Sequence, residues 1–293
     1  MLYHPKSGFT LIELSIVLVI IGLIIGGVLV GQDLIRAAEV RATISQIEKY
    51  QTAVNTFREK YGAVPGDLNA LVATQFGFTA RGNYAGQGDG NGILQGVDAN
   101  LAGHNYGNVQ NCGESAMFWV DLTTANGMNI NMIEGSFSTA SPTTPPGNIS
   151  GTFLTGYFPQ AKIGRGNYIY VYSNSSVLTP ATNYFGISAL SQVGTVTAVN
   201  STPAITVKQA YDIDKKVDDG YPTSGRVVAY YLNTTGIWGA EGGVANLYGS
   251  AGPVSASSQT CYDDGGNSAA PMLYSLTQAN GAYANCALSF GFQ

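Results

Sequence analysis

The chain has 293 residues, of which 45% are hydrophobic and only 11% are charged, and its formal net charge at pH 7 is −5. It has no run of basic residues, which argues against a nucleic-acid surface. His4 and His104 are the only histidines, too few to pair a nucleophile with a base, and no G-x-x-x-x-G-K-[ST] phosphate loop occurs, so an enzyme is disfavoured.

The segment 9–32 is the part of the chain that cannot be left in water. Every residue from Leu14 to Gly31 is uncharged, and eighteen such residues in a helix cross most of a hydrocarbon core roughly 30 Å thick. Lys6, in the short segment 1–8, favours the cytoplasmic side for the N-terminus. Glu13 is an acid inside the apolar run, where insertion costs about 2.5–3.5 kcal/mol at mid-bilayer and less near the ends. Such a carboxylate needs a partner.

A plain membrane anchor or a secretory signal peptide is the alternative interpretation of this segment. A secretory signal would follow its apolar region with small residues in an A-x-A-like cleavage site. Here Val30-Gly31-Gln32-Asp33 supplies none.

Lys6-Ser7-Gly8 followed by Phe9-Thr10-Leu11-Ile12-Glu13 closely resembles the processing site of type IV prepilins and type II secretion pseudopilins, and the likeness covers roughly the first 60 residues. The resemblance implies that a prepilin peptidase cuts after Gly8 and methylates the new amino terminus at Phe9. It also implies that the Glu13 carboxylate pairs with the Phe9 ammonium of a neighbouring subunit during filament assembly. Two opposite charges in a low-dielectric core each remove the other's desolvation penalty.

The segment 33–61 predicts an amphipathic helix that continues the membrane span. Its apolar residues recur at three- and four-residue steps and their sums: Val40, Ile44, Ile47, Val54, Phe57 and Tyr61. A helix over 9–61 would be about 80 Å long. Gly62 predicts its C-terminal cap and Pro65 its stop.

The segment 62–293 predicts an extracytoplasmic globular head. The ranges 82–113 and 138–151 predict loops because glycine, asparagine or proline is frequent there, and 114–125 predicts a short helix. Strands are predicted at 168–172, 185–189, 193–197, 226–232 and 287–292. The expected fold is therefore α+β and pilin-like, with the long N-terminal helix packed on an antiparallel sheet.

Three cysteines, Cys112, Cys261 and Cys286, allow three pairings and leave one thiol over. The family resemblance implies a bond between Cys261 and Cys286, since pilins commonly close a C-terminal loop in this way. Such a loop would contribute roughly 3.5 kcal/mol in the chain-entropy model. The alternative, three unlinked thiols, conflicts with an oxidising periplasm. No redox or zinc site is expected, because there is no C-x-x-C and histidines are scarce.

Four acids, Asp212, Asp214, Asp218 and Asp219, form a candidate calcium site. Hard cations bind clustered carboxylates, and some pseudopilins hold calcium in their heads. The alternative is a short solvated helix over 207–219 that Gly220 caps. Acids in a last helical turn oppose the helix dipole, which favours a cation nearby. No other cofactor is predicted.

The run Gly88-Asp89-Gly90-Asn91-Gly92 carries the D-x-N-G core of an EF-hand loop. The later ligands and the closing glutamate of that loop are missing. A glycine-rich turn is therefore predicted there.

These features predict a structural subunit of a type IV pilus or type II secretion pseudopilus. Its partners would be prepilin peptidase, other pilin or pseudopilin subunits and inner-membrane lipid. The subunit would stand in the inner membrane with a periplasmic head and then enter an extracellular pilus or a periplasmic pseudopilus. The competing hypothesis is a membrane-anchored extracytoplasmic binding or adhesion protein, whose head binds a surface ligand and whose helix is merely a tether.

Overall fold

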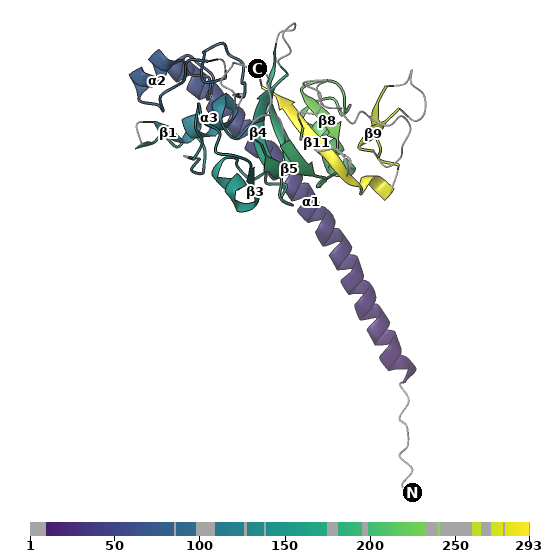
Figure 1. The fold of residues 1–293 in the computed structure, drawn as a ribbon. Coiled ribbons are helices and arrows are strands. Elements are labelled where there is room, and N and C mark those ends of the chain that lie inside the picture. The colour runs from purple at the N-terminus through teal and green to yellow at the C-terminus, as the bar shows by residue number, and fades with distance from the viewer. Residues whose placement is uncertain are drawn as a thin grey trace.

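The computed structural model describes residues 10–84, 86–97, 109–125, 128–137, 139–174, 181–194, 199–232, 239–240, 260–264, 271–277 and 279–292. Within these residues the fold is α+β, as predicted. A long helix, α1 (Leu11–Tyr61), extends from a head that contains an antiparallel β-sheet (Figure 1). The N-terminal end of α1 lies far from the head.

Helix α1 is held at both ends by local signals that the sequence contains. At its start, the Thr10 side chain accepts a hydrogen bond from the Glu13 backbone, and the Glu13 side chain accepts one in return, which is a capping box. At its end, Gly62 has φ 74° and its N–H donates to the Arg58 carbonyl. Only glycine adopts this left-handed conformation at little cost, so the predicted helix end is confirmed.

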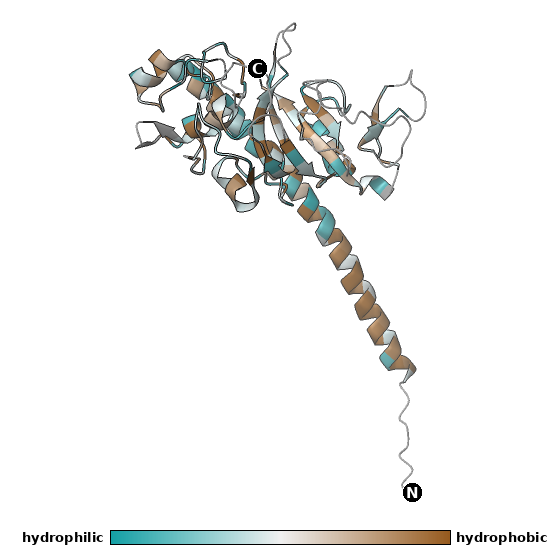
Figure 2. Cartoon of the chain, in the orientation of Figure 1, coloured by the Kyte–Doolittle hydropathy of each residue, from teal (hydrophilic) through white to brown (hydrophobic). Residues whose placement is uncertain are grey.

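The two halves of α1 meet different surroundings. No residue of its most apolar 18-residue window is buried by the chain itself. In Figure 2 the ribbon of this half, which extends beyond the head, is coloured as hydrophobic along most of its length. The other half packs into the head with these buried residues: Val40, Thr43, Ile47, Tyr50, Ala53, Val54, Phe57 and Tyr61. They recur every three or four positions, as expected for one face of a helix. Ile44, which was predicted on the same face, is half-buried against the core.

The head contains an antiparallel sheet whose central pair is β5 (Asn183–Val193) and β11 (Ala284–Gly291). Outside this pair, β4 (Tyr168–Ser173) adds to β5 and β8 (Val227–Tyr231) adds to β11. Shorter strands extend it: β3 (Ile149–Ser150) and β6 (Val199–Thr202) pair with β5, and β7 (Ile205–Thr206) pairs with β11. Two separate hairpins are β1 (Thr124–Ala125) with β2 (Met128–Asn129), and β9 (Tyr262–Asp263) with β10 (Leu273–Tyr274).

Three further helices and two 3₁₀ turns complete the described head: α2 (Ala70–Phe76), α3 (Gly113–Thr123), α4 (Val207–Val217), η1 (Gly151–Gly156) and η2 (Ala279–Gly281). Helix α3, close to the predicted 114–125, is buried over its whole length. Its Trp119 ring lies 5.2 Å from the Tyr50 ring of α1, which connects the helix to the core.

The strand predictions at 168–172, 185–189, 226–232 and 287–292 fall on β4, β5, β8 and β11. The separate strand predicted at 193–197 is wrong at its start, because Val193 is the last residue of the eleven-residue β5. Residues 195–198 lie outside the described part of the chain. The predicted loop at 138–151 contains β3 at its end.

Replacing Phe57 with Ala should lower the free energy of unfolding by about 3–5 kcal/mol, because it leaves a cavity in a fully buried aromatic cluster. The Phe57 ring lies 4.6 Å from Tyr61 and 5.5 Å from Phe78. Urea unfolding of the full chain in neutral detergent, followed by Trp119 fluorescence, measures the change. Exposed Thr56→Ala on the same helix is the control, expected within about 0.5 kcal/mol of the parent. Equal effects of the two substitutions would contradict the packing described here.

Candidate functional site

The start of α1 places one carboxylate on an otherwise apolar surface. The Thr10 backbone N–H and hydroxyl donate to Glu13 Oε2 at 2.7 and 2.8 Å. Glu13 Oε1 accepts no hydrogen bond from the described residues. Leu11 and Ile12 are 86% and 69% exposed, so the carboxylate is surrounded by apolar side chains that the chain does not cover. Gly8 and Phe9, the predicted processing residues, lie outside the described residues.

One oxygen of the charged Glu13 carboxylate thus has no hydrogen-bond donor among the described residues. Water could not reach this oxygen if the apolar surface around it were covered. An ionised carboxylate offers several lone-pair sites, and the cap uses only one oxygen. A cation brought to Oε1 by another chain could therefore pair with Glu13 without breaking the cap.

Cys261 and Cys286 are joined by a disulfide, the pair that the family resemblance implied. Cys286 belongs to β11 and Cys261 directly precedes β9, so the bond attaches the β9–β10 hairpin to the main sheet. Cys112 is free and buried. Burial raises the pKa of its thiol to about 12, which keeps it protonated and unreactive at neutral pH.

The four acids of the candidate calcium site do not converge on one point. Asp214, Asp218 and Asp219 bring carboxylate oxygens within 4.8 Å of one another. Asp212 does not join them, because it forms an ion pair with Lys208 one helical turn earlier. Residues on one helix face recur every three to four positions, so Asp212 and Asp214 point in different directions.

The three converging carboxylates already accept hydrogen bonds from the chain. Asp214 accepts from the Tyr274 hydroxyl at 2.7 Å and from the Gly220 N–H at 3.2 Å. Asp218 accepts from the backbone of Arg226 and Val227. These bonds hold the turn after α4, whose last residue is Val217 and whose C-cap is Asp218 rather than the predicted Gly220.

A second acid cluster, which the sequence did not suggest as a unit, consists of Asp67, Asp89 and Glu114. Asp67 accepts from the N–H groups of Gly90 and Gly92, each at 2.6 Å. Glu114 accepts from the N–H groups of Gly88 and Gln95, each at 2.9 Å. The glycine-rich run is therefore a turn, as predicted, and it is bound to two buried carboxylates. The only signal in the sequence was the glycine run itself.

Burial changes the protonation of these acids. It raises the pKa of Asp67 to about 7, and the nearby Asp89 charge adds to the effect. Burial and the Asp67 charge raise the pKa of Glu114 well above its usual value. Burial likewise raises the pKa of Asp214 to about 6, with Asp219 and Asp218 acting in the same direction.

One buried ion pair accompanies this cluster. Arg81 Nη2 lies 2.6 Å from both carboxylate oxygens of Asp121, and the Gly66 N–H donates to the same carboxylate at 2.7 Å. The pair ties the segment after α2 to α3. Removal of one partner of such a pair typically costs about 3–5 kcal/mol, since the other charge stays buried. Its role is therefore structural.

Comparison with known protein families gives a match at the N-terminus of the chain. Residues 4–29 match the family model described as the prokaryotic N-terminal methylation motif. No curated protein and no solved structure matches the chain. The matched residues include Gly8, Phe9 and Glu13, and the motif ends within the exposed apolar half of α1.

Asp67→Asn should reduce the dependence of stability on pH. The folded chain holds the Asp67 proton up to about pH 7, whereas the unfolded chain loses it near 3.8. The stability that this group contributes is therefore complete below about pH 4 and falls by roughly 1.4 kcal/mol per pH unit up to about pH 7. Urea unfolding of the full chain at pH 5 and pH 8 measures the difference. Exposed Glu59→Gln should leave that difference unchanged, and a parent-like difference in Asp67→Asn would contradict the assignment.

Calcium at the Asp214, Asp218 and Asp219 carboxylates remains a prediction. A bound ion adds RT ln(1 + [L]/Kd) of stability, so millimolar calcium should raise the melting temperature of the full chain. Asp219→Asn should abolish the rise, and Asp89→Asn, the exposed acid of the other cluster, should preserve it. No calcium-dependent shift in the parent would favour the alternative of a helix without a cation, although this helix is not simply solvated as that alternative supposed, because Val207, Ala210 and Ile213 are buried.

Proposed function

Because its first 29 residues carry the N-terminal methylation motif of type IV pilins and pseudopilins, we propose that the chain is a structural subunit of a type IV pilus or a type II secretion pseudopilus. Prepilin peptidase would cut it after Gly8 and methylate Phe9. Before assembly the subunit would span the inner membrane, with its head in the periplasm. It would then enter an extracellular pilus or a periplasmic pseudopilus together with other pilin-like subunits.

The observation that carries this proposal is the exposed apolar half of α1 with Glu13 at its start. A membrane tether would need only the apolar surface. An acid within that surface would raise the free energy of insertion into the bilayer. A filament subunit uses the same acid, because the new amino terminus at Phe9 of a neighbouring subunit supplies the opposite charge. Glu13 Oε1, which accepts no hydrogen bond from the described residues, supports this role.

The glycines of this half also suit helix association. A Cβ added at Gly22, Gly26, Gly27 or Gly31 would have no neighbour within 4 Å among the described residues, apart from the adjacent backbone of α1 itself. Small residues let a second helix approach closely. The segment can therefore pack against lipid or against other helices without rearrangement of the head.

Glu13→Gln tests the charge, because glutamine can also complete a capping box but carries no charge. The variant should be cut after Gly8, carry a methylated Phe9 and fractionate with membranes as the parent does. It should fail to enter sheared filaments when it is the sole copy, since an unpaired buried ammonium costs about 3–5 kcal/mol per contact. Mass spectrometry of the N-terminus and immunoblots of the membrane and filament fractions provide the measurements.

Thr10→Val is the matched control, because it removes the hydroxyl of the cap and keeps the Glu13 charge. This variant should still assemble. If Glu13→Gln builds filaments as well as the parent, the charge-pairing mechanism is wrong and a membrane-anchored binding or adhesion protein becomes the better account. If both variants fail equally, the helix cap and not the charge is required.

A further inference from the structure

The dipeptide Asn-Gly occurs three times in the chain, at residues 91–92, 126–127 and 280–281. In such a dipeptide the glycine nitrogen can attack the side-chain carbonyl carbon of the asparagine and close a five-membered succinimide ring. Glycine hinders this ring closure least, because it has no Cβ and its backbone is the most permissive. Asn91-Gly92 lies in the glycine-rich turn, next to the cluster of Asp67, Asp89 and Glu114.

The nitrogen that would attack already donates its hydrogen to a buried carboxylate. Gly92 N–H donates to Asp67 Oδ2 at 2.6 Å, and Gly90 N–H holds the other oxygen, Oδ1, at 2.6 Å. A general base must lie within hydrogen-bond reach of the proton that it removes, and Asp67 meets this condition. Burial raises the pKa of Asp67 to about 7, so at pH 8 the carboxylate is mostly ionised and is a stronger base than an exposed aspartate.

The side-chain amide that would be attacked is held through both of its polar atoms. Asn91 Oδ1 accepts from the Ile93 N–H at 2.7 Å. Negative charge gathers on this oxygen when a nitrogen adds to its carbon, and a backbone N–H stabilises such an oxyanion. Asn91 Nδ2 donates to Asp89 Oδ2 at 2.9 Å and to Gln95 Oε1 at 3.2 Å. Asn91 is also exposed, so water reaches it.

We propose that Asn91 is a self-modifying site, at which Asp67 is the general base for succinimide formation with Gly92. Asp67 takes the proton from the Gly92 nitrogen as that nitrogen forms a bond to Asn91 Cγ. The bond between Cγ and Nδ2 then breaks, and Nδ2 leaves with the proton as ammonia. Water later adds to a carbonyl carbon of the ring and opens it, which leaves aspartate or isoaspartate at position 91.

The product carries a new negative charge beside acids that already lie close together. Asp67, Asp89 and Glu114 bring carboxylate oxygens within 4.8 Å of one another. In the aspartate product a carboxylate oxygen replaces Nδ2, so the two hydrogen bonds to Asp89 and Gln95 become contacts between acceptors. Conversion therefore weakens the glycine-rich turn as the protein ages.

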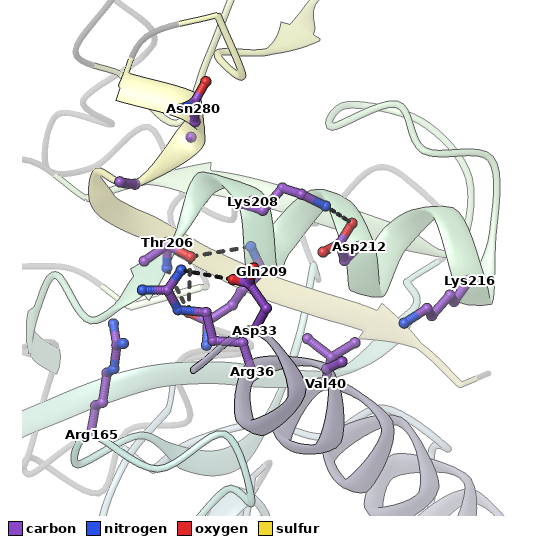
Figure 3. Close-up of a pocket in the computed structure, with 13 residues that line it drawn as sticks. Asp33, Arg36, Val40, Arg165, Thr206, Lys208, Gln209, Asp212, Lys216 and Asn280 are labelled. Carbon is purple, nitrogen blue, oxygen red and sulfur yellow. Dashed lines mark hydrogen bonds and ion pairs between the residues drawn. The ribbon is translucent and has the colours of Figure 1, made fainter. Parts of the chain in front are cut away.

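Asn280-Gly281 provides a comparison within the same chain. Asn280 is exposed on η2 and lines a cavity between α1 and α4, where its side chain points away from Asp33 and Asp212 (Figure 3). Within the described part of the chain, no carboxylate accepts a hydrogen bond from the Gly281 N–H. This copy therefore has the same local sequence without the base. The third copy, at 126–127, lies outside the described residues.

Incubation of the full chain in neutral detergent at pH 8, followed by peptide mapping with tandem mass spectrometry, measures the loss of each amide. The native chain is compared with the same chain unfolded in urea, where only the local sequence sets the rate. Asn91 should be converted faster in the native chain than in urea, whereas Asn280 should not. Asp67→Asn should slow the native conversion of Asn91 by about tenfold or more, because a general base typically contributes about 10²–10⁴-fold.

Exposed Glu59→Gln, which removes the same charge from α1, is the matched control and should convert Asn91 at the parental rate. Conversion of Asn91 in the native chain at the urea rate or more slowly overturns the proposal, because the fold then protects the site. Parental conversion in a folded Asp67→Asn variant also overturns it, and the melting temperature shows whether that variant is folded. If Asp67→Asn does not fold, the comparison of native with unfolded parent still decides.

Asn91→Asp tests the consequence for the turn, because it carries the charge of the aspartate product. It should melt at a lower temperature than the parent. An equal or higher melting temperature would overturn the loss of turn stability.

Discussion

The structure depends on a single helix that must satisfy two environments at once. The second half of α1 supplies the centre of the head, where Tyr50 contacts Trp119 and Phe57 is fully buried. The first half supplies an apolar surface that the chain leaves uncovered. Because one unbroken helix joins them, whatever covers the first half also fixes where the head lies. A lipid bilayer and a bundle of identical helices are both apolar enough to do so.

The described head uses buried carboxylates to hold segments that have few ladder hydrogen bonds. Asp67 and Glu114 bind backbone N–H groups of the glycine-rich turn, and Asp121 binds Gly66. Asp218 does the same for the turn after α4. The donors that Glu114 and Asp121 satisfy are buried, where a missing partner costs about 1–3 kcal/mol per group. These acids lie close together because their carboxylates bind backbone N–H groups of the fold. A bound cation would be an additional stabilising contact.

Charges bracket the apolar half of α1 at both ends. Glu13 lies at its start, with an Oε1 atom that accepts no hydrogen bond from the described residues, and the ion pair of Asp33 and Arg36 follows its end. Under the proposed function, Glu13 would find its counter-charge on another subunit of a filament. Such an ion pair would be strong, because water is excluded from a bundle of apolar helices.

The sequence by itself determined the features that arise from local order. The apolar run, the three-to-four-residue spacing from Val40 to Tyr61 and the glycine at position 62 were enough for α1, because helices form and end through contacts within a few residues. Only the tertiary structure decided which acids meet. Asp212 was expected beside Asp214 and instead pairs with Lys208, while Asp67 and Glu114 converge on one glycine turn. Such convergence depends on how distant segments pack, which neither spacing nor composition encodes.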